Sequence, residues 1–154
     1  MSWWTRILTG EDEAVKPKRL DYLNEGLALE RQGDYEGAVT SYHLALRDQP
    51  NNVKVLQYIA IALSRTGRRE EAIRHYRKAL EIAPDLAGAH YGLGFLLLKR
   101  GDTLRAGEHL RTFLSTPPRD PEMAQWVDFA RQALARIDGE RASLGTPVAD
   151  GEPA

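Results

Sequence analysis

Small and apolar residues recur along this chain with a period of 34 residues. Gly33, Gly67 and Gly101 are each followed five residues later by an alanine. Further small residues, an aromatic or leucine residue and a proline return in the same register, at Gly26, Ala60, Gly94; Ala38, Ala72, Ala106; Ala45, Ala79; Tyr42, Tyr76, Leu110; and Pro50, Pro84, Pro118. A fixed period of this length indicates one helical hairpin stacked on copies of itself.

Each recurring residue type has a physical role in such a hairpin. Small residues let two antiparallel helices approach closely, and an intervening ring fills the gap beside the next hairpin. Proline stops the second helix because it has no N–H to continue the hydrogen-bond ladder. Glycine ends the first helix because it accepts a positive φ. The pattern therefore predicts three hairpins, at residues 19–52, 53–86 and 87–120.

A further amphipathic helix is predicted over residues 121–138, where it would cap the array. Its apolar residues follow one another at spacings of three and four, at Met123, Trp126, Val127, Ala130, Leu134 and Ile137. A terminal unit must bury one face and expose the other, and this segment has both. We expect Gly139 to end the helix and residues 139–154, which hold little apolar material, to be disordered.

The leader, residues 1–18, carries a short apolar stripe formed by Trp3, Trp4, Ile7 and Leu8, followed by a polar linker. Exposed apolar clusters normally mark contacts. Three interpretations remain open. The leader packs on the first hairpin as an extra helix, or it docks on a partner or in the groove of a second copy and drives self-association, or it rests weakly on a membrane surface.

The recurring pattern resembles the tetratricopeptide repeat family from about Arg19 to Asp120. The resemblance implies an all-α fold, a right-handed superhelix of three helical hairpins with a C-terminal capping helix. Two positions depart from the family pattern. Glu25 stands where a leucine-like residue is usual, and Phe113 replaces the second small residue of the third unit. We expect Phe113 to open or repack the seam of the third hairpin.

The resemblance also implies a concave groove, lined by the first helix of each hairpin and extended by the capping helix. The residues expected there are Leu20, Leu23, Leu27, Glu30, Lys54, Gln57, Ile61, Ser64, Gly88, Tyr91, Phe95, Leu98, Gln125, Phe129 and Gln132. Members that clamp acidic chaperone tails use lysine, asparagine and arginine at set places, which here hold Leu23, Leu27, Tyr58, Gly88 and Gly92. An aliphatic and aromatic groove instead favours an apolar or amphipathic peptide.

Composition narrows the class of protein further. The chain has 154 residues, a formal net charge of -1 and no cysteine, so a disulfide framework and a thiolate metal site are excluded. It shows no apolar run of the roughly 20 residues that a membrane span needs, and no signal-peptide pattern. We expect a cytoplasmic protein.

The arginines of the second unit are the strongest argument for a nucleic-acid partner. They crowd around one turn and helix, yet Glu70, Glu71, Glu81 and Asp85 lie among them. A solvated face with ion pairs at helical spacing is the favoured interpretation, so a nucleic-acid partner is not expected.

No catalytic arrangement is found, and neither an enzyme activity nor a cofactor is expected. The four histidines have no pair at the helical spacing of metal ligands, so a metal is not expected either. His75 and His109 occupy equivalent places in adjacent units and could stack near one another.

The functional hypothesis is a non-enzymatic adaptor or assembly factor that binds a segment of another protein in its groove. The alternatives are a structural scaffold that assembles through its own leader, and an assembly factor associated with a membrane.

Overall fold

The computed structural model describes residues 21–145, and within that range the secondary structure is helical. The helices are α2 (Tyr22–Arg31), α3 (Tyr35–Asp48), α4 (Val53–Arg65), α5 (Arg69–Ile82), α6 (Ala87–Arg100), α7 (Thr103–Ser115), the short 3-10 helix η1 (Pro121–Met123) and α8 (Ala124–Gly145). The predicted all-α array of three hairpins and a C-terminal helix is confirmed.

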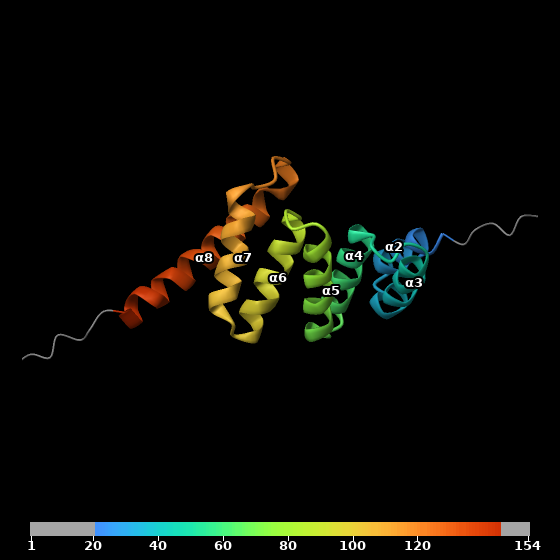
Figure 1. Ribbon diagram of the computed structural model, residues 1–154, viewed down its shortest axis with the longest axis horizontal. Helices are drawn as coiled ribbons and strands as arrows, with labels where there is room; N and C mark the ends of the chain where they lie inside the picture. The colour runs from blue at the N-terminus through green and yellow to red at the C-terminus, as the bar shows by residue number, and fades with distance from the viewer. Residues whose placement is uncertain (1–20, 146–154) are drawn as a thin grey trace, which may run out of the picture.

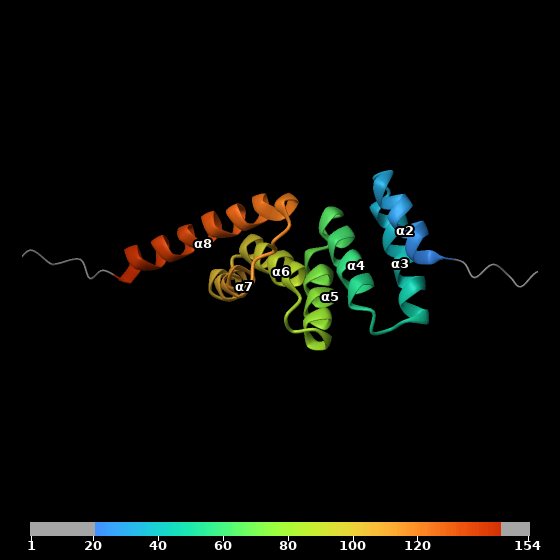
Figure 2. The same ribbon diagram turned by 90° about the horizontal axis from the view of Figure 1, so that it is seen from above.

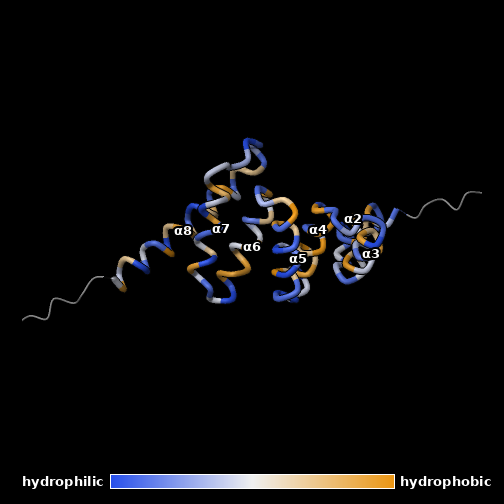
Figure 3. The backbone as a smooth tube through the Cα atoms, in the orientation of Figure 1, coloured by the Kyte–Doolittle hydropathy of each residue, from blue (hydrophilic) through white to orange (hydrophobic). Residues whose placement is uncertain are grey.

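Consecutive helices pack against each other in chain order. Helices α2 and α3, α4 and α5, and α6 and α7 form hairpins, and α8 packs on α7. The hairpins follow one another along the long axis of the molecule, with α8 at the opposite end from α2 (Figures 1 and 2). The first helices of the second and third hairpins are the most apolar, whereas α5 is mainly hydrophilic (Figure 3). Apolar residues are therefore concentrated in α4 and α6, the first helices of two neighbouring hairpins.

The turns within the hairpins confirm the role expected of the three periodic glycines. Gly33, Gly67 and Gly101 have φ values of 80°, 80° and 90°. An L side chain resists this left-handed conformation, and glycine does not. After two of these glycines an aspartate caps the next helix: the Asp34 carboxylate accepts from the Gly37 N–H at 2.9 Å, and Asp102 caps α7 in the same way.

Small residues allow the close seams between helices. Ala38, Ala72 and Ala106 are completely buried. The ring of Tyr42 lies against Gly26, where a Cβ would collide with it. Glu25, the departure from the leucine-like position, is exposed and so causes no strain in the seam.

Phe113 does not open the third hairpin. Its side chain is 2% exposed, and its ring lies 5.2 Å from the ring of Tyr91. The seam has repacked around the larger residue, which was one of the two expected outcomes.

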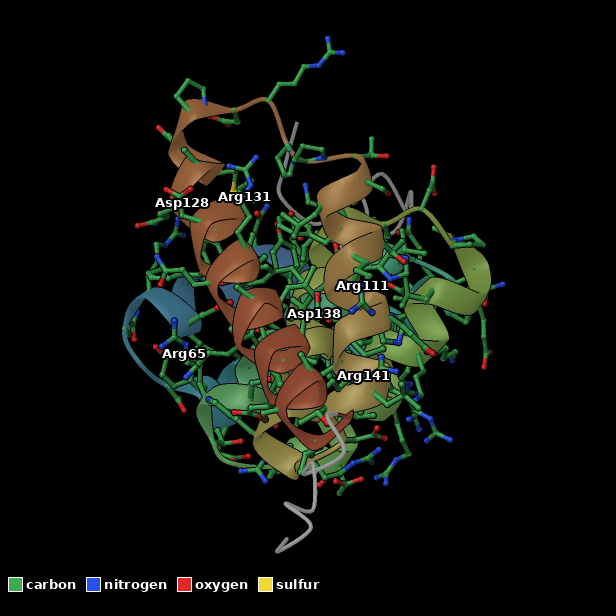
Figure 4. The ribbon with its side chains drawn as sticks, turned by 90° about the vertical axis from the view of Figure 1, so that its left-hand side faces the viewer. Arg65, Arg111, Asp128, Arg131, Asp138 and Arg141 are labelled. Atoms are coloured by element: carbon green, nitrogen blue, oxygen red, sulfur yellow. The ribbon has the colours of Figure 1, made fainter. Side chains whose placement is uncertain are left out.

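The expected end of the last helix at Gly139 is wrong, because α8 continues to Gly145. Ile137 is buried, and Asp138 pairs with Arg111 of α7. Figure 4 shows these two charged side chains between α7 and α8. A glycine inside a helix costs about 1 kcal/mol, which such anchoring can offset. The expected disorder is therefore wrong for residues 139–145, while 146–154 lie outside the described range.

The buried face of α8 also differs in part from the predicted one. Val127, Ala130, Ala133 and Ile137 are buried, whereas Trp126 is 37% exposed. Ala133 thus takes a core position that was not predicted, and the ring of Trp126 packs edge-on against Tyr91 of α6.

The leader residues Trp3, Trp4, Ile7 and Leu8 lie outside the described part of the chain, as does Leu20. Their three interpretations stay predictions. Across residues 21–145, none of the helices combines the length and the apolar character needed to cross a bilayer.

Candidate functional site

A pocket of about 600 Å³ lies between α4, α6 and the start of α8. Its lining residues are Lys54, Gln57, Tyr58, Ile61, Ser64, Arg65, Tyr76, Gly88, Tyr91, Gly92, Phe95, Leu96, Lys99, Phe113, Met123 and Trp126. Six of these are aromatic. We call this volume the aromatic pocket.

The aromatic pocket exists because one repeat position changes from tyrosine to glycine. At the junction of the first two hairpins, Tyr58 stacks on Tyr42 with ring centroids 5.6 Å apart. At the next junction the equivalent residues are Gly92 and Tyr76, 34 positions further along. The Tyr76 ring lies over Gly92, where a Cβ would collide with it. Because glycine has no ring to stack on Tyr76, this junction leaves room for the pocket, which the otherwise buried Tyr76 side chain still borders.

Tyr91 is the centre of the aromatic wall. Its ring lies 4.7 Å from that of Phe95, 5.2 Å from that of Phe113 and 4.8 Å from that of Trp126. Tilted and edge-to-face pairs at these separations are favourable arrangements of aromatic rings. The three partners come from α6, α7 and α8, so the wall joins the third hairpin to the C-terminal helix.

Two tyrosine hydroxyls of the pocket, those of Tyr76 and Tyr91, are harder to ionise than a free tyrosine. Burial raises the pKa of Tyr76 and that of Tyr91 above the ordinary value of tyrosine. Within residues 21–145, the Tyr76 hydroxyl has no hydrogen-bond partner. It can therefore donate to a group that enters the pocket.

The charged residues that line the pocket all carry a positive charge. Lys54 lies in the first turn of α4, Arg65 ends α4, and Lys99 lies in the last turn of α6. Aspartate and glutamate are missing from the lining.

Part of the predicted groove comes together in this pocket. Lys54, Gln57, Ile61, Tyr91 and Phe95 all line it, together with Ser64 and Gly88. These are residues of the second and third hairpins.

The other predicted residues lie elsewhere. Leu23 lines a separate hollow of about 300 Å³ between the first two hairpins, and Leu27 is half-buried against the core. Leu98 lines a hollow beside α8, while Gln125 and Phe129 are exposed outside the aromatic pocket. The predicted wall residues thus line three different hollows or lie outside them.

Sequence reasoning missed several residues of the pocket. These are Tyr58, Arg65, Tyr76, Gly92, Leu96, Lys99, Phe113, Met123 and Trp126. One signal was present, because Arg65 and Lys99 are 34 positions apart and each directly follows an expected wall residue.

The histidines form two pairs that cross between helices. The rings of His43 and His75 are 5.4 Å apart, and those of His90 and His109 are 5.2 Å apart. The suggested stacking of His75 on His109 is therefore replaced by other pairings. No group of three or more histidine, cysteine, aspartate or glutamate side chains in residues 21–145 is arranged to hold a metal.

The second histidine pair makes one consistent set of hydrogen bonds when both imidazole rings are neutral. His90 Nε2 lies 2.7 Å from the carbonyl oxygen of Pro84, so this nitrogen donates. Its Nδ1 then accepts from His109 Nδ1 at 3.0 Å. Burial, and then the neighbouring His90, lower the pKa of His109.

Two arginines beside the turns of the second and third hairpins are paired with acids. Arg68 contacts Glu71 at 2.7 Å and Glu36 at 3.0 Å, and Arg100 contacts Glu70 at 3.2 Å. The predicted ion-paired face is therefore seen at Arg68, whereas Arg74, Arg77 and Lys78 form no ion pair within residues 21–145.

The fold is a solenoid of short helical hairpins with a pocket on its first helices. This is the architecture of a helical-repeat protein. Residues 62–101 match the family described as TPR repeat, and residues 23–54 match the one described as tetratricopeptide repeat. The chain belongs to the tetratricopeptide repeat family. No curated protein matches it in sequence.

Solved structures share the fold. The TPR domain of Sgt2 from Aspergillus fumigatus has a TM-score of 0.66 and 22% identity, over 86% of this chain and 87% of that one. The type III secretion chaperone SycD of Yersinia enterocolitica, in complex with a peptide of the translocator YopD, has a TM-score of 0.73 and 14% identity, over 78% and 92%.

The second TPR domain of human RPAP3, in complex with the HSP70 peptide SGPTIEEVD, has a TM-score of 0.64 and 20% identity, over 76% and 92%. Likeness at these identities establishes the fold, and two of the three neighbours were solved with a peptide bound.

Proposed function

We propose that this protein is a non-enzymatic adaptor or assembly factor that holds an apolar or amphipathic segment of a partner protein in the aromatic pocket. The observation that carries the proposal is the aromatic pocket beside Gly92, which is bordered by Tyr76, Tyr91 and Phe95. The peptide complexes of two structural neighbours support a peptide-binding role.

Area burial and aromatic anchoring would supply the affinity. Interface energies are concentrated in a few buried aromatic or arginine residues, whose truncation costs about 2 kcal/mol or more. Phe95 is half-buried in the pocket wall and touches Tyr91, so it is the residue most suited to that role.

A pull-down from native lysate tests the proposal, with Phe95→Asp compared against Phe129→Asp. Phe129 is a matched control because it was also predicted to line the concave groove. Its side chain is 53% exposed and lies outside the pocket. Both variants are first checked for helical content by circular dichroism. We expect Phe95→Asp to lose partners that Phe129→Asp retains. If a folded Phe95→Asp chain retains every partner, the pocket does not bind them.

Self-association through the leader is the second candidate. The leader holds two tryptophans, Trp3 and Trp4, and the pocket of another copy offers them an aromatic surface. Light scattering of the chain with and without residues 1–10 distinguishes the two functions. Loss of a larger species on deletion supports assembly, and a monomer at all concentrations excludes it. Vesicle co-sedimentation of the same two chains tests membrane association.

A cytoplasmic location is part of the proposal. It is motivated by the absence of cysteine from the sequence. Fractionation of cells that express the tagged chain tests this location directly.

A further inference from the structure

We infer that the segment bound by the aromatic pocket is acidic, with carboxylates on both sides of its apolar anchor. This inference rests on the proposed peptide-binding function and names the chemistry of its partner. It follows from which charges line the pocket, from their lack of partners and from their spacing.

The three cations of the pocket form no ion pair, unlike Arg68 and Arg100 beside the hairpin turns. Lys54, Arg65 and Lys99 are exposed, and their side chains have no ion pair within residues 21–145. By contrast, Arg68 and Arg100 each contact two carboxylates. Since acidic residues are missing from the pocket lining, the charge of its cations is left for an occupant to complement.

The cations stand at the two ends of the pocket, and the aromatic wall lies between them. Lys54 is at the start of α4, and Arg65 is its last residue. Lys99 is near the end of α6, the equivalent helix of the next hairpin, and so belongs to the same end as Arg65. An uncharged or apolar segment would bury its anchor but leave the positive charges at both ends of the pocket without an opposite charge.

The separation of the two ends sets the spacing of the carboxylates. Lys54 and Arg65 are 11 residues apart, which is about 16 Å along a helix that rises about 1.5 Å per residue. An extended peptide covers this length in about five residues, at roughly 3.3 Å each. The occupant in extended form therefore carries an acidic residue, about four residues that include the apolar anchor, and a second acidic residue.

Charge pairs at an exposed rim act mainly on selectivity, association rate and salt dependence. At physiological ionic strength the screening length is about 8 Å, so only carboxylates held near the three cations contribute. Binding of the acidic segment should consequently weaken as salt is added, whereas burial of its apolar anchor should not.

Selection of random twelve-residue peptides displayed on phage, against the full chain, tests the inference. Three chains are compared: the natural chain, a pocket variant with Lys54→Glu, Arg65→Glu and Lys99→Glu, and a matched control. The control carries Arg47→Glu, Arg74→Glu and Lys78→Glu on the outer helices α3 and α5, where the side chains are exposed and outside the pocket. Both variants change the net charge by the same amount.

We expect the natural chain and the control to select apolar peptides flanked by aspartate or glutamate at a spacing of about five. The best peptide, labelled with fluorescein, should bind the pocket variant at least about tenfold more weakly, with a change of less than about twofold for the control. The difference should shrink as sodium chloride is raised from about 0.05 to 0.5 M.

Apolar peptides selected without acidic enrichment, and lost on Phe95→Asp, would overturn the inference while the proposed function stands. Selection that yields no peptide sensitive to Phe95→Asp would remove the proposed function itself. If peptides are selected only after residues 1–10 are deleted, the leader of this chain occupies the pocket. That result would overturn the assignment of the pocket to a partner protein.

Discussion

The substitution Gly92→Ala tests how the aromatic pocket is built. Gly92 is in the interior of α6, where replacing glycine by alanine gains about 1 kcal/mol from helix propensity. The added Cβ, however, would meet the Cζ and hydroxyl oxygen of the Tyr76 ring, which is 4% exposed. Overpacking of this kind costs about 1–3 kcal/mol. The net result is a loss of stability between about zero and 2 kcal/mol.

Gly88→Ala in the same helix is the matched control. A Cβ there would meet the Nε2 of Gln57, which is the end of a flexible side chain and can move away. The propensity gain then remains, and we expect stabilisation by up to about 1 kcal/mol. The two variants should differ by up to about 3 kcal/mol although the chemical change is identical.

Urea unfolding followed by circular dichroism measures this difference through the midpoint, provided that both variants show the same dependence on urea. If Gly92→Ala is as stabilising as Gly88→Ala, Tyr76 does not lie on Gly92. The presence of glycine in place of tyrosine at position 92 would then not explain the pocket.

Three further predictions concern the seams, the histidines and the last helix. Ala72→Leu should overpack a completely buried seam and lower the unfolding free energy by about 1–3 kcal/mol, measured by urea unfolding. Burial lowers the pKa of His43 and of His109, each with a neighbouring imidazole as the second cause, so the unfolded chain binds more protons. Stability should be complete above about pH 6.5 and fall below it, and His43→Asn with His109→Asn should reduce that slope in unfolding curves at pH 7.5 and 5.5. Asp138→Asn removes a half-exposed ion pair and should cost less than about 1 kcal/mol by thermal unfolding, so a larger loss would contradict its surface character.

The hairpins could be predicted from sequence because their signals are local. A glycine with positive φ, a buried alanine five residues later and a proline beyond the second helix each act within one unit. The helices end where this reasoning places them: α3 ends at Asp48 before Pro50, and α5 ends at Ile82 before Pro84.

The aromatic pocket could be predicted only in part because it depends on contacts between units. The residues expected from the first helices, such as Tyr91 and Phe95, do line it. It is also bordered by Tyr76 of a second helix, and whether another ring stacks on that tyrosine depends on a residue 16 positions later, Gly92. The repeat period predicts which residues occupy equivalent positions, but it does not show which aromatic ring packs against which residue of the next unit.

The length of α8 was mispredicted because a local signal was overridden by packing. Gly139 marks a helix end by composition, yet the contacts of Ile137 and Asp138 with the rest of the array hold the helix at that point. The propensity of one glycine is too small to decide against them.

The aromatic pocket takes its walls from successive units, since α4 and α6 belong to two hairpins and Trp126 belongs to α8. In a solenoid each unit contacts only its neighbours, so the ends can unfold before the middle. A bound segment would touch all these units together, and its binding energy would favour the states in which they are folded at the same time. Occupancy would therefore join α4 through α8 into one cooperative block and leave the α2–α3 hairpin as a separately melting end.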